Sequence, residues 1–134
     1  MEALRIHHLG VAVEDLDDAV ATYERLFGGT VERRNAVPSQ GVEAAAVRLG
    51  ASRVELVTPL GENTPVGRFL AKRGQGMHHV AYAVVDLPAA LSDLAARGAH
   101  LIDEQPHEGL FGLQVAFVHP ESVHGVLSEL VADG

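Results

Sequence analysis

The chain has 134 residues, of which 47% are hydrophobic and 21% charged, so it can bury a core and is not globally disordered. Its formal net charge of −8 argues against general attraction to nucleic acid or anionic lipid, and we expect neither a nucleic-acid nor a membrane partner. Cysteine is absent, which excludes disulfides, thiolate ligands and a cysteine nucleophile, while 8 histidines leave a metal site open. The N-terminus carries no signal-like segment, and we expect a cytoplasmic protein.

The first module is read from the N-terminus. Residues 6–13 are β-branched and apolar enough for a strand, and Asp15 is positioned to cap a following helix. Gly28 and Gly29 end that helix. Turn-forming residues then separate three predicted strands at 30–36, 42–49 and 52–58. The segment is therefore predicted to fold as βαβββ.

A short helix is predicted to link this segment to the next. Thr64 caps it and Pro65 occupies its first position. The second module then has a strand at 77–84, a helix capped by Asp86 and ended by Gly98, and strands near 99–103, 113–118 and 124–131. The order of elements is the same as in the first module.

Two stretches of sequence support a duplication. Residues 7–19 read HHLGVAVEDLDDA and residues 78–90 read HHVAYAVVDLPAA. The ends of the modules match as well, because residues 55–57 and residues 129–131 both read ELV. The chain is therefore interpreted as two copies of one unit, each below the size that usually folds alone. We expect an α+β fold with modules at 5–58 and 77–131 and a linker at 59–76.

The alternation of side chains along the predicted strands points to four polar residues as candidates for a site. His8 shares its strand face with Gly10 and Ala12, and His79 shares its face with Ala81 and Ala83. A face reduced to Gly and Ala leaves room for a ligand, whereas the opposite, bulky faces suit packing against helices. On the last strand of each module, one glutamate alternates with apolar neighbours. These glutamates are Glu55 and Glu129.

Two imidazoles and two carboxylates suit a divalent metal such as Co, Mn, Ni, Fe or Zn, and Ca less well. A single strand histidine is more often a structural residue than a ligand. The recurrence of one histidine and one glutamate in both modules favours the metal site, because packing alone gives little reason to repeat a buried carboxylate. Descent of the repeat without retained function is the alternative.

The motifs HHLGVAVEDLDDAV, VELVTPLGENTPVGRFLAK, GMHHVAY and FVHPESVHGVLSEL resemble the vicinal oxygen chelate (glyoxalase/bleomycin resistance/dioxygenase) superfamily, and within it the methylmalonyl-CoA epimerases. The resemblance covers residues 6–131. It implies a single domain over 1–134 whose modules form a cup-shaped mixed sheet around a metal, most favourably cobalt. It also implies an isomerase acting on an acyl-CoA, a homodimer, and four metal ligands. These ligands would be His8, Glu55, His79 and Glu129.

One position departs from part of that family. Some epimerases carry an acid/base glutamate three residues after the glycine that matches Gly41, and this chain has Ala44 there. Glu43 is adjacent but should point to the other face of its strand. The resemblance therefore leaves Glu129 as the candidate for proton transfer, in addition to its ligand role.

Two other functions stay open at this level. A glyoxalase I (lactoylglutathione lyase) uses a similar His/Glu/His/Glu set, and a metal-free binding or resistance protein shares the fold but lacks the full set. Phosphates of CoA need cations, for which two groups are available, although each is as readily an ordinary solvated surface. These are Arg68, Lys72 and Arg73 on the linker helix, and Arg33 and Arg34 on a strand.

The remaining histidines are given structural roles. His7 and His78 are expected to be buried and hydrogen-bonded, His100 to be exposed, and His119 to support the fold. Residues 107–112 contain two glycines and are predicted either to cover the site or simply to form a turn between strands.

Overall fold

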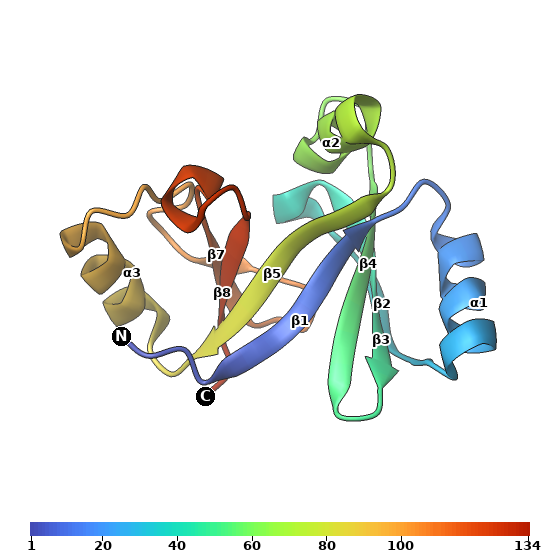
Figure 1. Cartoon of the computed structure of the whole chain (residues 1–134), viewed down its shortest axis with the longest axis horizontal. Helices are drawn as coiled ribbons and strands as arrows, with labels where there is room; N and C mark the ends of the chain where they lie inside the picture. Colours follow the sequence, from blue (N-terminus) through green and yellow to red (C-terminus); the bar gives the residue numbers. More distant parts are fainter. The chain divides into compact units, whose positions relative to one another are not determined.

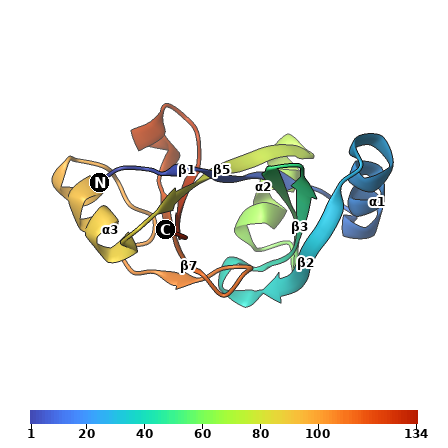
Figure 2. The same ribbon diagram turned by 90° about the horizontal axis from the view of Figure 1, so that it is seen from below.

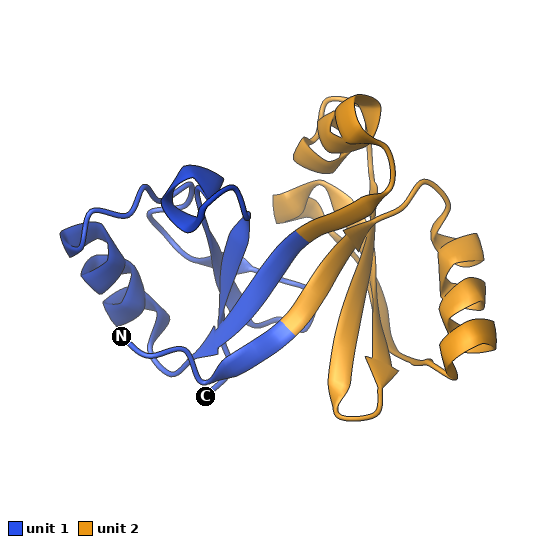
Figure 3. Cartoon of the chain, viewed as in Figure 1, with its two compact units in different colours: residues 1–7, 79–134 blue, residues 8–78 orange.

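The computed structural model describes residues 1–134 and divides into two compact units, coloured separately in Figure 3. Unit 1 comprises Met1–His7 and His79–Gly134, and unit 2 comprises His8–His78. Both boundaries fall within strands, so the first strand of each sequence module begins in one unit and continues in the other.

Unit 2 contains the first predicted βαβββ module followed by the linker helix. Its strands are ordered β2-β3-β4-β1, with β2, β3 and β4 antiparallel and β1 parallel to β4 (Figure 1, Figure 2). A single 3-10 turn, Pro38–Gln40, joins β2 to β3. The bounds are β1 (Arg5–Ala12), α1 (Leu16–Phe27), β2 (Thr30–Val37), β3 (Val42–Leu49), β4 (Ser52–Pro59) and α2 (Pro65–Arg73).

The helix caps of unit 2 are those predicted from sequence. The backbone N–H of Asp18 donates to the Asp15 carboxylate at 3.0 Å, which satisfies one of the free donors at the start of α1. Gly28 ends α1 in the left-handed conformation, with φ of 66°. The N–H of Gly67 donates to the Thr64 hydroxyl at 3.1 Å at the start of α2.

Unit 1 contains most of the second module, with strands ordered β5-β8-β7-β6. β5 and β8 are parallel, and β8, β7 and β6 are antiparallel. The N–H of Ala89 donates to the Asp86 carboxylate at 3.0 Å, which confirms the predicted cap of α3. The bounds are β5 (Gly76–Val84), α3 (Leu87–Ala96), β6 (His107–Glu108), β7 (Gln114–Val118) and β8 (Ser128–Ala132).

The predicted strand at 99–103 is wrong. Leu101 makes only an isolated bridge, and the N–H groups of Ile102 and Asp103 both donate to the carbonyl of Phe117. The N–H of Phe117 donates in turn to the Asp103 carboxylate at 2.9 Å, so side-chain bonding replaces the ladder at this point. The second strand of the module is the two-residue β6 instead. The last strand also begins later than predicted, at residue 128 rather than 124, after a 3-10 turn.

Each unit buries an apolar core between its helix and the bulky face of its strands. In unit 1, Leu87, Leu91 and Leu94 of α3 pack against Tyr82 and Leu130. In unit 2, the corresponding cluster lies between α1 and its strands, and its buried members are Val13, Leu16, Ala45, Val47 and Leu56. The predicted division into bulky and small strand faces is therefore confirmed. No helix is long and apolar enough to cross a membrane.

Candidate metal centre

His8 and Glu55 form the first His/Glu pair, within unit 2. Gly10 on β1 lies opposite Glu55 on β4 in the parallel ladder. Because alternate residues of a strand share a face, His8, Gly10 and Glu55 lie on one face, as predicted. The Nε2 atom of His8 is 3.3 Å from Oε2 of Glu55, and both side chains are buried.

His79 and Glu129 form the second pair, within unit 1. Ala81 on β5 lies opposite Glu129 on β8 in the parallel ladder, so the same parity argument places His79 and Glu129 on one face. The Nε2 atom of His79 is 3.5 Å from Oε1 of Glu129. These are the most deeply buried polar side chains of the site, because only 3% of His79 and 2% of Glu129 are exposed.

The chemistry of these donors fits a divalent cation. Burying a carboxylate away from water costs several kcal/mol unless a cation or hydrogen-bond donors compensate, and the chain buries one in each unit. In both units the atom facing the carboxylate is the Nε2 of an imidazole, a nitrogen that binds divalent metals in its neutral form. Imidazole nitrogens and carboxylate oxygens are ligands that Co, Mn, Ni, Fe and Zn accept.

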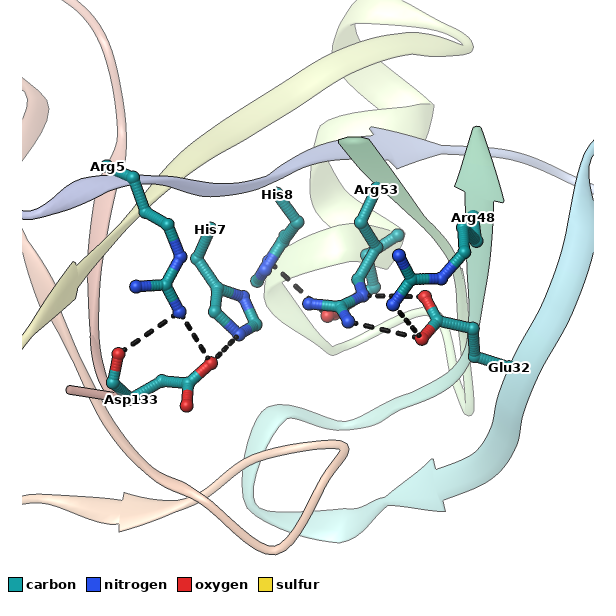
Figure 4. A network of polar contacts seen from close by, with 8 residues as sticks. Arg5, His7, His8, Glu32, Arg48, Arg53 and Asp133 are labelled. Carbon is teal, nitrogen blue, oxygen red and sulfur yellow. Dashed lines mark hydrogen bonds and ion pairs between the residues drawn. The ribbon is translucent and has the colours of Figure 1, made fainter. Parts of the chain in front are cut away.

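An arginine cluster beside Glu55 was not found by the sequence interpretation. Arg53 lies two residues before Glu55 and therefore on the same face of β4. Its guanidinium donates to the Glu32 carboxylate at 2.9 and 3.2 Å, and Arg48 donates to the same carboxylate at 3.0 Å (Figure 4). These hydrogen bonds, that from Arg53 foremost, lower the pKa of Glu32. The positive charges of Arg48 and Arg53 are thus paired with the negative charge of Glu32.

Ala44 lies on the same face as Glu55, and no acid takes its place there. Ala46 is the direct antiparallel partner of Glu55, and Ala44 is two residues away on β3. Glu43 points to the other face, where its carboxylate accepts a hydrogen bond from Arg34 at 3.3 Å. The predicted orientation of Glu43 is confirmed.

His107 of unit 1 lies on the same strand face as Glu129. His107 is only partly buried, and its Nε2 is 3.1 Å from Oδ2 of Asp103. The ring of Phe117 contacts both His79, at a centroid distance of 5.7 Å, and His107, at 6.3 Å. The sequence interpretation considered His107 only within the segment 107–112, as part of a cover for the site or of a turn between strands, and gave its side chain no role of its own.

The residues after His107 form a closed turn. The N–H of Gly109 donates to the carbonyl of Leu113 at 2.8 Å, and the Phe111 ring packs edge-on against His7 at 6.3 Å. Leu110 is buried. The turn between strands, one of the two sequence expectations for this segment, is observed.

The other histidines have the structural roles assigned to them, with one difference. His7 is buried with its Nε2 3.1 Å from the Asp133 carboxylate, which also accepts from Arg5 at 2.9 Å (Figure 4). His78 is half-buried rather than buried and packs edge-on against Phe69 at 4.9 Å. Burial lowers the pKa of His78.

His100 and His119 form a surface pair in unit 1. Their rings stack in parallel at 4.6 Å, and His100 is exposed as predicted. The Nδ1 of His119 accepts the N–H of Glu121 at 3.0 Å, which caps the 3-10 turn at 120–123. His119 therefore supports the fold, as the sequence suggested.

Comparison with known proteins gives a consistent result. The sequence profile of the Glyoxalase/Bleomycin resistance protein/Dioxygenase superfamily matches residues 7–117. Human mitochondrial methylmalonyl-CoA epimerase is 37% identical over 127 residues, which cover 94% of this chain and 72% of the human protein. An ethylmalonyl-CoA/methylmalonyl-CoA epimerase from Cereibacter sphaeroides is 37% identical over 94% of this chain and 96% of its own.

Solved structures agree with this. A variant of Streptomyces coelicolor methylmalonyl-CoA epimerase in complex with 2-nitronate-propionyl-CoA has a TM-score of 0.93 and 36% identity, covering 97% of this chain and 94% of its own. The epimerase from Mycobacterium tuberculosis has a TM-score of 0.93 and 33% identity, covering 96% and 87%. The predicted glyoxalase-like α+β fold class is confirmed by these similarities.

Proposed function

Because the chain belongs to the Glyoxalase/Bleomycin resistance protein/Dioxygenase superfamily, we propose that it is a methylmalonyl-CoA epimerase, an isomerase that interconverts the (2R) and (2S) forms of its substrate. The observation that carries the proposal is the similarity along almost the whole chain to several proteins named for this activity. The buried His/Glu pair in each unit supplies the chemistry that such a reaction needs.

We assign His8, Glu55, His79 and Glu129 as the ligands of one divalent cation. The assignment rests on three observations: each pair offers a nitrogen and an oxygen donor on one strand face, each is buried, and each occupies the same place in its module. Cobalt is the preferred ion, and Mn, Ni, Fe or Zn have compatible ligand chemistry. The bound ion would supply positive charge near the thioester oxygen, on which negative charge develops when C2 loses its proton.

The chain's own residues have three tasks in this reaction. The small residues Gly10 and Ala81, beside the ligand histidines on their strand faces, leave space for the malonyl group. Glu129 is assigned a part in moving the C2 proton, because a carboxylate is a suitable general base. For binding the CoA phosphates, the exposed cations of α2, such as Lys72, are better candidates than Arg34. The charge of Arg34 is already paired with acidic residues.

The test is proton exchange at C2. Purified protein is incubated in heavy water with (2R)- or (2S)-methylmalonyl-CoA, after cobalt loading or after chelation, and both deuterium uptake and configuration are followed. We expect deuterium uptake and inversion from either epimer in the metal-loaded protein, and loss of both after chelation. Ethylmalonyl-CoA in parallel reports how large an acyl branch is accepted.

Two results would reject the proposal. One is the absence of exchange with every metal tested. The other is turnover of the methylglyoxal–glutathione adduct together with no exchange at C2, which would favour a glyoxalase I activity. A cytoplasmic location and a homodimer remain predictions, and sedimentation of the purified chain tests the second.

A further inference from the structure

We propose that His107, held by Asp103, carries the proton for one face of C2. This inference rests on the epimerase function proposed above. Inversion at C2 requires that a proton leaves from one face and arrives at the other, which calls for two groups or one mobile relay. The chain lacks an acid at Ala44, so a second group must come from elsewhere.

Strand register places His107 on the face of the sheet that bears Glu129. His107 on β6 lies opposite Val115 on β7, and Val115 lies opposite Val131 on β8. Directly paired residues of antiparallel strands project their side chains to the same face. Because Val131 and Glu129 are two residues apart, His107 and Glu129 share that face.

Phe117 contacts both His107 and His79. Phe117 lies opposite Glu129 in the β7–β8 ladder, and its ring contacts His79 edge-on at 5.7 Å. The same ring is nearly parallel to that of His107, with an interplanar angle of 23° and a centroid distance of 6.3 Å. His107 is therefore one aromatic ring away from His79.

Asp103 fixes the orientation and the tautomer of His107. Its Oδ2 accepts the N–H of Phe117 at 2.9 Å and lies 3.1 Å from Nε2 of His107, so the carboxylate is itself anchored to β7. An ionised carboxylate only accepts hydrogen bonds, which assigns the proton to Nε2 and the lone pair to Nδ1. A carboxylate that orients an imidazole in this way is a recurring device in general acid–base catalysis.

The proton balance is simple. The C2–H bond breaks, its electron pair remains on the substrate as the enolate, and the proton passes to Nδ1 of His107. A group on the opposite face of C2 then delivers a proton to C2. His107 returns its proton to solvent, which can reach the imidazole because 23% of the side chain is exposed. In the reverse direction the protonated imidazole donates to C2. No oxidant, reductant or leaving group is involved.

A purely structural role for the Asp103–His107 contact makes a different prediction. Such a contact would only hold the β6–β7 hairpin, and its loss would slow the reaction of both epimers equally. A proton carrier serves one face of C2, so its loss affects the two epimers differently. The stereochemistry of exchange therefore separates the two roles.

The experiment compares cobalt-loaded wild type with His107→Gln in heavy water, starting from each epimer. In the variant we expect one epimer to incorporate deuterium with retention of configuration, and the other to lose exchange by about 100-fold or more, the usual contribution of general acid–base catalysis. Inversion should be lost from both. Asp103→Asn should show a weaker form of the same asymmetry, and added imidazole should restore inversion to His107→Ala.

The controls make each outcome decisive. His100→Gln changes an exposed histidine of the same unit and should leave exchange and inversion of both epimers unchanged. Circular dichroism and a thermal melt verify that the variants are folded. Near-normal inversion by His107→Gln, or an equal loss for both epimers, overturns the role of His107 while the epimerase proposal stands. No exchange by wild type overturns the proposed function itself.

Discussion

The Nε2 atom of His8 lies 3.3 Å from Oε2 of Glu55, although the two residues are on strands separated in sequence by α1, β2 and β3. The parallel pairing of β1 with β4 brings them together, because it sets Gly10 opposite Glu55. In unit 1 the pairing of β5 with β8 does the same for His79 and Glu129. The duplication therefore repeats a strand pairing, and through it a pair of donor atoms.

Glu55→Gln should weaken cobalt binding. The amide keeps the size of the side chain and a neutral oxygen but removes the negative charge, so we expect the dissociation constant to rise about 10- to 100-fold, comparable to the cost of altering a metal's supporting groups. Isothermal titration calorimetry with cobalt on chelator-treated protein measures this.

Glu43→Gln is the matched control for that substitution. It makes the same chemical change in unit 2, but its carboxylate pairs with Arg34 on the other strand face. Its cobalt affinity should equal that of wild type. Equal affinities for Glu55→Gln and wild type would contradict the ligand assignment.

The two His/Glu pairs could be predicted from sequence because strand geometry is strictly periodic. Once the repeat set the strands, alternation alone put His8 with Gly10 and Ala12, and the match of the two ELV segments selected the glutamates. Pairing register did not have to be known. The same alternation correctly predicted that Glu43 points to the other face of its strand.

The surroundings of the pairs could not be predicted in the same way. Arg53 contacts Glu32 through a β-bulge between Val31 and Arg33, and an irregular register of this kind leaves no periodic signal. Similarly, residues 99–103 have the composition of a strand, but the side chain of Asp103 takes the N–H that a ladder would use. Both features depend on tertiary hydrogen bonds that local sequence does not encode.

Asp15→Ala should destabilise the chain by about 1 kcal/mol, the usual cost of losing an N-terminal helix cap. The Asp15 carboxylate accepts the N–H of Asp18 at 3.0 Å, and alanine leaves that donor without its side-chain acceptor. Urea unfolding followed by circular dichroism measures the change. Asp15→Asn retains an acceptor oxygen and should lose less. If both substitutions cost the same, charge rather than capping is responsible.

Glu32 should make the stability of the chain sensitive to acid. Its pKa is lowered from 4.5 when folded, first by the hydrogen bond from Arg53 and also by that from Arg48. Below pH 4.5 the unfolded chain therefore binds this proton more readily than the folded chain, and stability falls as the pH decreases. The contribution of the pairing is fully present above that pH. It is lost as the pH falls through the folded value.

Glu32→Gln tests this linkage. Between about pH 5 and pH 3, the free energy of unfolding should fall less steeply with decreasing pH in the variant than in wild type, because the substituted side chain does not titrate. Glu24→Gln, at an exposed position on α1, is the control for removing one negative charge and should follow the wild-type slope. Parallel urea titrations at several pH values give the slopes. Identical slopes for Glu32→Gln and wild type would refute the linkage.

Gly67→Ala should destabilise the chain although the residue lies inside α2, where alanine normally stabilises a helix by about 1 kcal/mol relative to glycine. A Cβ at this position would lie 2.5 Å from the carbonyl oxygen of Gly61 and 2.6 Å from that of Glu62. Both are backbone atoms of the segment that leads into the helix, so relief requires the chain itself to move. We expect a net loss of stability of about 1–3 kcal/mol, the usual cost of overpacking, measured by urea unfolding.

Gly61→Ala is the matched control, because a Cβ at Gly61 would meet nothing within 4 Å and the substitution should change stability little. A stabilised Gly67→Ala would mean that the turn before α2 yields to the methyl group and that helix propensity decides the balance.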